Sequence, residues 1–373
     1  MRIYQDDLFT TADLARLADL APTLPDLTGS AWRDAIIDRI VYADNPWSRD
    51  AEARGGDACR GWLAEAARAD LRDLQALSAS SPQGSGPAWG AGEPAAAAMA
   101  LAGASDWGDC LPQLAEHHHR QGCGDLSRYA AFRWQGRRLR PVADPDLVRP
   151  EDIVGHVEAR AALASNTERF LRGLPAHDVL LFGGRGTGKS SSVKALLTRY
   201  RDRGLRLVEA GREVVGDFSD LAAAVRGRRQ RFILFLDDLS FEAEETEYKA
   251  LKAALEGGVE ARPGNLLVYA TSNRRHLVRE AFAEREDLHG QDTLEEKVSL
   301  ADRFGLTVRF ATPDEEGYLA IVAALCRARG IDPDASRLRE RALQWAAWGS
   351  GRSGRSARQL VDVLVAEAAE ARR

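Results

Sequence analysis

Hydrophobic positions in the first third of the chain follow helical spacing. Apolar side chains recur every three or four residues, first over residues 32–41 and then over residues 63–74. A segment rich in serine, glycine and proline follows at residues 78–87 and is typical of a linker. Six of the eight tryptophans precede residue 150, and we interpret them as helical core. The pattern predicts a mainly α-helical N-terminal domain over residues 1–125.

After residue 125 the pattern changes to short apolar runs. Alternation over residues 129–140, around Gln135-Gly136, predicts a small hairpin, and the spaced prolines that follow indicate an extended connector up to residue 150. Three continuous apolar runs then predict buried parallel strands, at residues 178–182, 232–236 and 266–271. Between the last two runs, residues 245–255 have helical spacing.

The first of these strands leads directly into a glycine-rich loop and then a helix. The loop has the spacing G-x-x-x-x-G-K-[ST] in the strand–loop–helix setting that this motif requires. Its backbone N–H groups would cradle phosphate oxygens, Lys189 would reach the outer phosphates, and the Ser190 hydroxyl would bind Mg²⁺. The residues that we expect to bind nucleotide here are Gly183, Gly184, Arg185, Gly186, Thr187, Gly188, Lys189, Ser190 and Ser191.

The second and third strands end in polar residues that could complete such a site. Asp237 and Asp238 follow the second strand, at the edge of a parallel sheet where ligands bind. We expect Asp237 to hold Mg²⁺ together with Ser190, and Asp238 to orient or deprotonate the attacking water. Asn273, after the third strand, could touch the γ-phosphate and that water; the alternative is a simple Asx turn.

Composition and charge narrow the class of protein. The 373 residues carry a net charge of −5, and the acidic excess is N-terminal, because residues 1–125 carry −9 and residues 126–150 carry +4. No run is apolar and long enough to span a bilayer, and the first residues do not resemble a signal peptide. Four scattered cysteines fit reduced thiols, so we expect a cytoplasmic protein without membrane association. Cys110, Cys123 and the three consecutive histidines 117–119 lack zinc-site spacing.

Together these motifs resemble an AAA+ ATPase. The amino-acid sequence of three blocks is similar to that of one bacterial ATP-binding family within AAA+, domain of unknown function 815. The resemblance covers roughly residues 126–373, and the blocks that carry it are residues 184–191, 235–242 and 269–275, with further AAA+ likeness at residues 152–156 and 299–306.

The resemblance implies an α/β fold, a P-loop αβα sandwich with a parallel sheet, followed by a helical lid. The domains would then be a basic hairpin and connector at 126–150, a nucleotide-binding core at 151–312 and a lid at 313–373. ATP would bind between core and lid at a subunit interface, in a nucleotide-promoted homo-oligomer such as a hexameric ring. Val154 and Gly155 would lie beside the adenine. Arg303 would be the arginine finger, or alternatively pair with Glu295 or Glu296. Arg355, or Arg358 in its place, would be the lid arginine, unless it is simply solvated.

One position departs from the AAA+ pattern and leaves the function open. These enzymes usually carry glutamate where this chain has Asp238, and Glu242 could compensate for the shorter side chain. We expect an ATPase that performs conformational work on a macromolecular partner bound through residues 1–125. The alternatives are a slow or non-hydrolysing ATP-dependent switch and a nucleic-acid remodeller or loader. A basic patch of four arginines (Arg133, Arg137, Arg138 and Arg140) favours the nucleic-acid alternative. The acidic charge of residues 1–125 and the neutral charge of residues 151–373 disfavour it.

Overall fold

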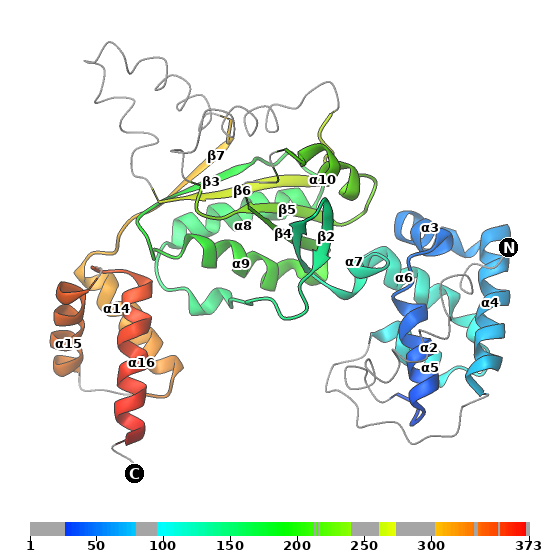
Figure 1. Ribbon diagram of the computed structural model, residues 1–373, viewed down its shortest axis with the longest axis horizontal. Coiled ribbons are helices and arrows are strands. Elements are labelled where there is room, and N and C mark those ends of the chain that lie inside the picture. The colour runs from blue at the N-terminus through cyan, green and yellow to red at the C-terminus, as the bar shows by residue number, and fades with distance from the viewer. Residues whose placement is uncertain are drawn as a thin grey trace. The chain divides into compact units, whose positions relative to one another are not determined.

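The structure is a computed structural model, and it describes residues 27–79, 95–211, 214, 216–239, 261–273, 303–331, 335–349 and 351–370. The chain divides into two compact units (Figure 1). The first comprises residues 1–130 together with residues 202–204 and 227–230, and the second comprises residues 131–201, 205–226 and 231–373. The helix predicted over residues 245–255 lies outside the described residues. No helix of the described ranges has both the length and the apolar character needed to cross a membrane.

The first unit is helical, as predicted. Local capping explains where two of its helices begin: Ser30 accepts a hydrogen bond from the backbone N–H of Arg33, and Asn45 and Ser48 form a reciprocal capping box around Pro46. In the part of this unit that the structure describes, the α-helices are α2 (Ala31–Val41), α3 (Pro46–Arg54), α4 (Trp62–Ala79), α5 (Ala96–Gly103), α6 (Leu111–Gln121) and α7 (Asp125–Arg128), with short 3-10 turns at Gly55–Cys59 and Trp107–Cys110.

Two tryptophans anchor the core of the first unit. Trp47 and Trp107 are fully buried, and each indole N–H donates to a backbone carbonyl, of Ala58 at 3.0 Å and of Leu101 at 2.8 Å. A buried indole N–H usually has such a partner, and these contacts fix the orientation of both rings. The interpretation as core is therefore confirmed for these two residues, but it is wrong for Trp62, which is 68% exposed at the start of α4.

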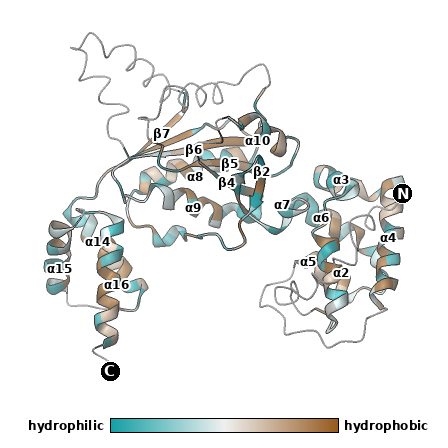
Figure 2. Ribbon diagram, in the orientation of Figure 1, coloured by the Kyte–Doolittle hydropathy of each residue, from teal (hydrophilic) through white to brown (hydrophobic). Residues whose placement is uncertain are grey.

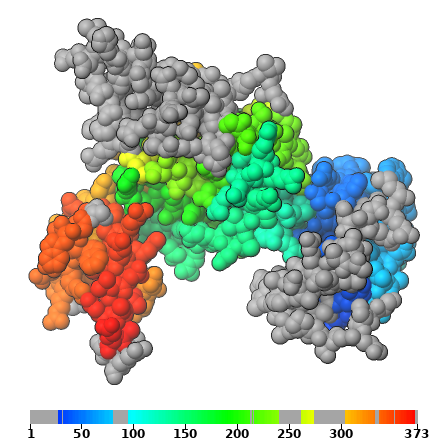
Figure 3. Space-filling view, in the orientation of Figure 1, coloured from blue at the N-terminus to red at the C-terminus, as the bar shows by residue number. Residues whose placement is uncertain are grey.

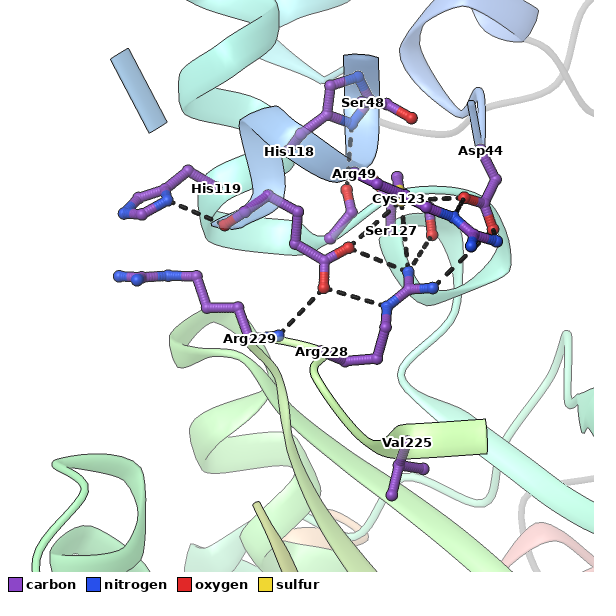
Figure 4. A network of polar contacts seen from close by, with 12 residues as sticks. Asp44, Ser48, Arg49, His118, His119, Cys123, Ser127, Val225, Arg228 and Arg229 are labelled. Carbon is purple, nitrogen blue, oxygen red and sulfur yellow. Dashed lines mark hydrogen bonds and ion pairs between the residues drawn. The ribbon is translucent and has the colours of Figure 1, made fainter. Parts of the chain in front are cut away.

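A buried carboxylate holds a short backbone segment within the first unit. Glu52, 3% exposed on α3, accepts hydrogen bonds from the Arg228 side chain and the Arg229 backbone N–H, both at 3.0 Å. The Cys123 thiol donates to the same carboxylate at 3.2 Å, and the Arg228 guanidinium also lies 3.9 Å from Asp44 (Figure 4). A buried carboxylate requires this number of partners, so Glu52 ties residues 228–229 to α3.

The second unit is built on a seven-stranded sheet with the order β2-β1-β4-β5-β6-β3-β7. The predicted hairpin forms its edge, since β1 and β2 pair antiparallel through Phe132–Pro141 and Gln135–Arg138, while every other neighbouring pair is parallel. The strands are β1 (Ala131–Gln135), β2 (Arg138–Pro141), β3 (Val179–Gly183), β4 (Leu205–Ala210), β5 (Arg231–Leu236), β6 (Leu266–Ser272) and β7 (Leu306–Phe310).

Helices cover this sheet, and the fold class predicted from the sequence is confirmed. Figure 1 shows α8 (Val157–Leu171) and α9 (Lys189–Tyr200) along one face, and α10 (Phe218–Val225) contacts β2. The central strands β5 and β6 are almost entirely buried and appear as apolar ribbon in Figure 2. Parallel strands that are covered on both faces require such continuous apolar runs, which explains why the runs predicted the strands.

Three C-terminal helices form a small bundle within the second unit. They are α14 (Glu315–Ala328), α15 (Ala335–Trp348) and α16 (Gly354–Glu370). Tyr318 and Val322 of α14 pack with Leu360 and Val361 of α16 in one buried cluster, and the space-filling view shows the three helices as one packed body (Figure 3). This bundle corresponds to the helical lid that the sequence resemblance implied.

Candidate functional site

The glycine-rich loop joins the end of β3 to the start of α9. Gly183, the last residue of β3, has φ +147°. A Cβ atom there would lie 2.0 Å from the carbonyl oxygen of Phe310 in β7, so only glycine fits between β3 and β7. Gly188 has φ +94° and is the N-cap of α9, whose first residue is Lys189. The loop therefore places its backbone at a helix N-terminus, the arrangement that binds phosphate oxygens.

Lys189 is buried and donates hydrogen bonds to three oxygens. Its ammonium group lies 2.9 Å from the carbonyl oxygen of Gly183, 2.8 Å from that of Gly184 and 2.9 Å from Oδ1 of Asn273. Burial lowers the pKa of Lys189, and the nearby charges of Asp237 and Asp238 oppose that shift. The lysine of the loop is thus bound to acceptors that phosphate oxygens could replace.

Asp237 follows β5 and lies directly against the loop helix. Its Oδ1 atom accepts hydrogen bonds from the hydroxyl of Ser190 at 2.7 Å and from that of Thr271 at 2.6 Å. Carboxylate and hydroxyl oxygens are the donor atoms that Mg²⁺ prefers, so Ser190 and Asp237 fit the predicted metal position chemically. The structure brings together two residues that are 47 positions apart in the chain.

Asp238 turns sharply out of the strand. Its backbone has φ +54°, a left-handed conformation that is uncommon outside glycine, aspartate and asparagine. Its backbone N–H donates to Thr271 Oγ1 at 2.8 Å, and its carboxylate accepts a hydrogen bond from the side-chain amide of Asn273. Asn273 therefore connects Lys189 to Asp238, which is more than a local Asx turn.

Thr271 is the site residue that the sequence analysis missed. It is 1% exposed and contacts both acids, through the side chain of Asp237 and the backbone of Asp238. Its position held a usable signal: Thr271 and Asn273 are two residues apart, and alternate residues of a strand share a face. Asn273 directly follows β6, and the strand alternation carried one residue further places Thr271 on the same side as Asn273.

The segment expected beside adenine approaches the same strand edge. Gly155 has φ +83° and His156 has φ +51°, and the His156 ring lies 4.9 Å from the ring of Phe310. Phe310 is also the residue whose carbonyl faces Gly183. The turn that contains Val154 and Gly155 is thereby placed near the beginning of the phosphate loop, while its role in binding adenine stays a prediction.

The lid touches the phosphate loop through the first turn of α16. The backbone N–H of Gly354 donates to the carbonyl oxygen of Gly186 at 2.9 Å, and a Cβ atom on Gly186 would lie 3.1 Å from Cβ of Arg355. Arg358 instead lies near Asp146. The pKa of Asp146 is lowered by its hydrogen bond from Lys194, and then by the positive charges of Lys194 and Arg358. The geometry therefore favours Arg355 over Arg358 beside the loop.

The remaining predicted residues are less tightly connected to this centre. Thr187 donates to the carbonyl oxygen of Gly184 at 2.9 Å within the loop, Arg185 is exposed, and Ser191 is half-buried at the start of α9. Arg303 is exposed just before β7. Glu242 lies outside the described residues, as do Glu295 and Glu296. The roles of all of these side chains stay predictions.

Two other candidate constellations are used in contacts within the protein. Of the basic patch, Arg133 pairs with Glu209 at 3.3 Å, and Arg137 pairs with Asp217 at 3.7 Å and with Asp220. These pairs engage two of the four arginines of the patch, and the nucleic-acid alternative stays a prediction.

The consecutive histidines have three separate partners, namely Ser127 Oγ at 2.7 Å for His117, the Gly122 carbonyl at 3.1 Å for His118 and the Glu52 carbonyl at 3.0 Å for His119. Burial lowers the pKa of His117 to about 4 and that of His118 to about 3, so both rings are neutral near pH 7.

Comparisons with known proteins place this site in context. The family described as "Protein of unknown function (DUF815)" matches residues 127–368, which confirms the resemblance that the motifs indicated. No protein with a curated description matches the chain.

Several solved structures are similar. The Holliday junction branch migration motor RuvB of Thermotoga maritima is 14% identical with a TM-score of 0.41, over 57% of this chain and 63% of that one. A variant of the same RuvB with one substitution is 15% identical with a TM-score of 0.41, over 56% and 61%. The FIGL-1 AAA domain in complex with ADP is 20% identical with a TM-score of 0.40, over 58% and 73%. The chain thus spans less than two thirds of these RuvB chains.

Proposed function

We propose that this chain, which belongs to the DUF815 family, binds Mg²⁺-ATP and hydrolyses it to drive conformational work on a macromolecular partner. One observation carries the proposal: two chains of hydrogen bonds tie the phosphate loop to the acid pair. Ser190 is joined to Asp237, and Lys189 is joined through Asn273 to Asp238. A loop with only a structural role does not require a lysine, a hydroxyl, an amide and two carboxylates in one place, whereas a Mg²⁺-nucleotide site does.

The arrangement suggests a role for each side chain. Lys189 would exchange the carbonyl oxygens of Gly183 and Gly184 for phosphate oxygens, and Ser190 and Asp237 would hold Mg²⁺, which supplies charge stabilisation during phosphoryl transfer. Asp238 would accept a proton from the attacking water. Asn273, already in contact with Asp238, would orient that water and the carboxylate.

The geometry at Asp238 also supports a slower function. The aspartate is one methylene shorter than the usual glutamate, its backbone is left-handed, and its carboxylate is engaged by Asn273. A protein with this acid could bind ATP tightly and turn it over slowly, and would then act as a nucleotide-dependent switch. Measured turnover distinguishes this candidate from the motor.

Assembly and partner binding complete the proposal. We infer a nucleotide-promoted homo-oligomer, in which Arg303 acts as a finger on a neighbouring ATP and Arg355 contacts the phosphates bound by its own chain. Residues 1–125 would bind the partner, and the described part of this region exposes the large apolar side chains of Trp62, Leu77 and Met99. Photo-cross-links from position 62 that never capture another macromolecule, while links from the second unit do, would contradict this assignment. We propose a cytoplasmic location.

Turnover measurements test the hydrolytic function. We expect Mg²⁺-dependent phosphate release from the wild-type chain, and no detectable release from Lys189→Ala. Asp238→Asn should still bind ATP but lose about 10²–10⁴-fold in kcat, since it removes the proposed base. Lys194→Ala is the matched control, because Lys194 lies on the same helix but pairs with Asp146 at 2.8 Å.

The outcomes separate the candidates. If Lys189→Ala released phosphate as fast as the wild type, the phosphate-loop assignment would be wrong. If the wild type bound ATP tightly in calorimetry without measurable release, the switch would be the function instead of the motor.

A further inference from the structure

We infer that Thr271 is a positioning residue that holds both acids of the site, setting the carboxylate of Asp237 for the metal and the turn at Asp238 for the base. This inference rests on the proposed function and adds a residue to it. Thr271 is the penultimate residue of β6, is 1% exposed, and contacts Asp237, Asp238 and Leu239.

The direction of its hydrogen bonds follows from chemistry. A hydroxyl carries a single hydrogen, and the Asp238 backbone N–H can only donate, at 2.8 Å. Thr271 Oγ1 therefore accepts a hydrogen bond from the Asp238 backbone N–H and donates one to Asp237 Oδ1 at 2.6 Å. One buried atom thus fixes a side chain and the adjacent backbone at the same time.

The main chain of Thr271 holds the same turn from its other end. The backbone N–H of Leu239 donates to the Thr271 carbonyl at 2.8 Å. Asp238, with φ +54°, lies between these two contacts, so its left-handed conformation is held on both sides by one residue of β6. A β-branched side chain has few rotamers, which makes threonine stiffer than serine at this position.

The consequence for the site is specific. Asp237 Oδ1 accepts two hydrogen bonds, one from the Thr271 hydroxyl and one from the Ser190 hydroxyl. Loss of the Thr271 hydroxyl frees the carboxylate to rotate and leaves the Asp238 N–H without its acceptor. Both changes act on the metal and on the base, while the phosphate loop and Lys189 keep their own contacts.

Three variants at this position isolate the hydroxyl. Thr271→Val keeps the shape and removes the hydroxyl, Thr271→Ser keeps the hydroxyl, and Thr271→Ala removes both. Thr198→Val is the matched control, because in the part of the chain that the structure describes the Thr198 hydroxyl is buried without a hydrogen-bond partner. Two readouts are measured: kcat for ATP, and Mn²⁺ affinity by electron paramagnetic resonance with a non-hydrolysable ATP analogue and protein in excess.

We expect Thr271→Val to weaken Mn²⁺ binding and to lower kcat by about 10–100-fold each, the usual effect of removing a group that orients a metal ligand. Affinity for the analogue without metal should stay within about threefold of the wild type, and Thr271→Ser and Thr198→Val should stay near wild type in both readouts. If Thr271→Val does not fold, the ratio between Thr271→Ser and Thr271→Ala provides the same comparison.

Two results would overturn the inference: wild-type Mn²⁺ affinity in Thr271→Val, or equal losses in Thr271→Ser and Thr271→Val. Failure of the proposed function looks different. If the wild-type chain binds Mn²⁺ with the analogue but releases no phosphate, the proposed hydrolytic function is wrong. The Mn²⁺ affinities of the variants still decide the role of Thr271.

Discussion

At Gly183 the backbone leaves no space for a side chain. A Cβ atom would meet the Phe310 carbonyl oxygen at 2.0 Å, whereas a Cβ atom on Gly188 would meet nothing within 4 Å although its φ is also positive. Both glycines belong to the phosphate loop, and they differ in which physical effect requires glycine. At Gly183, with φ +147°, the requirement is steric as well as conformational, and at Gly188 it is conformational alone.

This difference predicts unequal costs for the same substitution. Gly188→Ala should lower the free energy of unfolding by about 1 kcal/mol, the cost of a left-handed alanine. Gly183→Ala should cost several times more, because β3 and β7 must separate to admit the methyl group. Chemical denaturation of the two variants measures both values, and equal losses would show that β3 and β7 do not lie this close.

The left-handed turn also offers a reason for aspartate at position 238. Short polar side chains tolerate positive φ better than glutamate does, and φ here is +54°. The departure from the AAA+ pattern that raised the question of turnover is therefore consistent with the local backbone.

At the scale of elements, Glu52 joins α3 to the segment that precedes β5. Arg228 and Arg229 donate to its carboxylate at 3.0 Å, and residue 231 then begins β5, the strand that Asp237 follows. This clamp lies in the first unit, and the sequence of the segment alone provides no sign of it, since a run of arginines is ordinarily solvated.

We predict that Glu52→Ala lowers the free energy of unfolding of the first unit by about 3–5 kcal/mol, because the Arg228 charge is left buried without its carboxylate. Glu65→Ala is the control: Glu65 also pairs with an arginine, Arg68, but is 76% exposed, so its loss should cost less than about 1 kcal/mol. Hydrogen exchange of α3 and α6 peptides in the full chain measures both. Similar exchange in the two variants would contradict the clamp.

For the whole molecule, the proposed finger predicts a separation between assembly and turnover. We expect ATP to increase the mass measured by light scattering in the wild type. Arg303→Ala should assemble equally but lose about 10³-fold or more in kcat, since a finger acts on the transition state. Arg309→Ala, another exposed arginine six positions on in β7, should leave turnover unchanged.

Two results would count against this assignment. Turnover that survives Arg303→Ala in an assembled protein would remove the finger role, and a mass independent of ATP would remove nucleotide-promoted assembly.

Residues that are neighbours in the chain account for the local chemistry of the site. The phosphate loop depends on residues 183–190, which are adjacent in the chain, so spacing alone predicts the loop and the roles proposed for Lys189 and Ser190. Three of the buried strands, β3, β5 and β6, could be predicted in the same way, because a strand covered on both faces must be continuously apolar. The strands β4 (Leu205–Ala210) and β7 (Leu306–Phe310) were not predicted.

Which distant groups meet follows from the packing of the fold. The strand order places β6 beside both β3 and β5, and this brings Asn273 to Lys189 and Thr271 to Asp237. It also places Arg355, and not Arg358, against Gly186. Strand order and helix docking result from packing between segments far apart in the chain, and hydrophobic spacing specifies which face of each segment is buried but not which neighbour covers it.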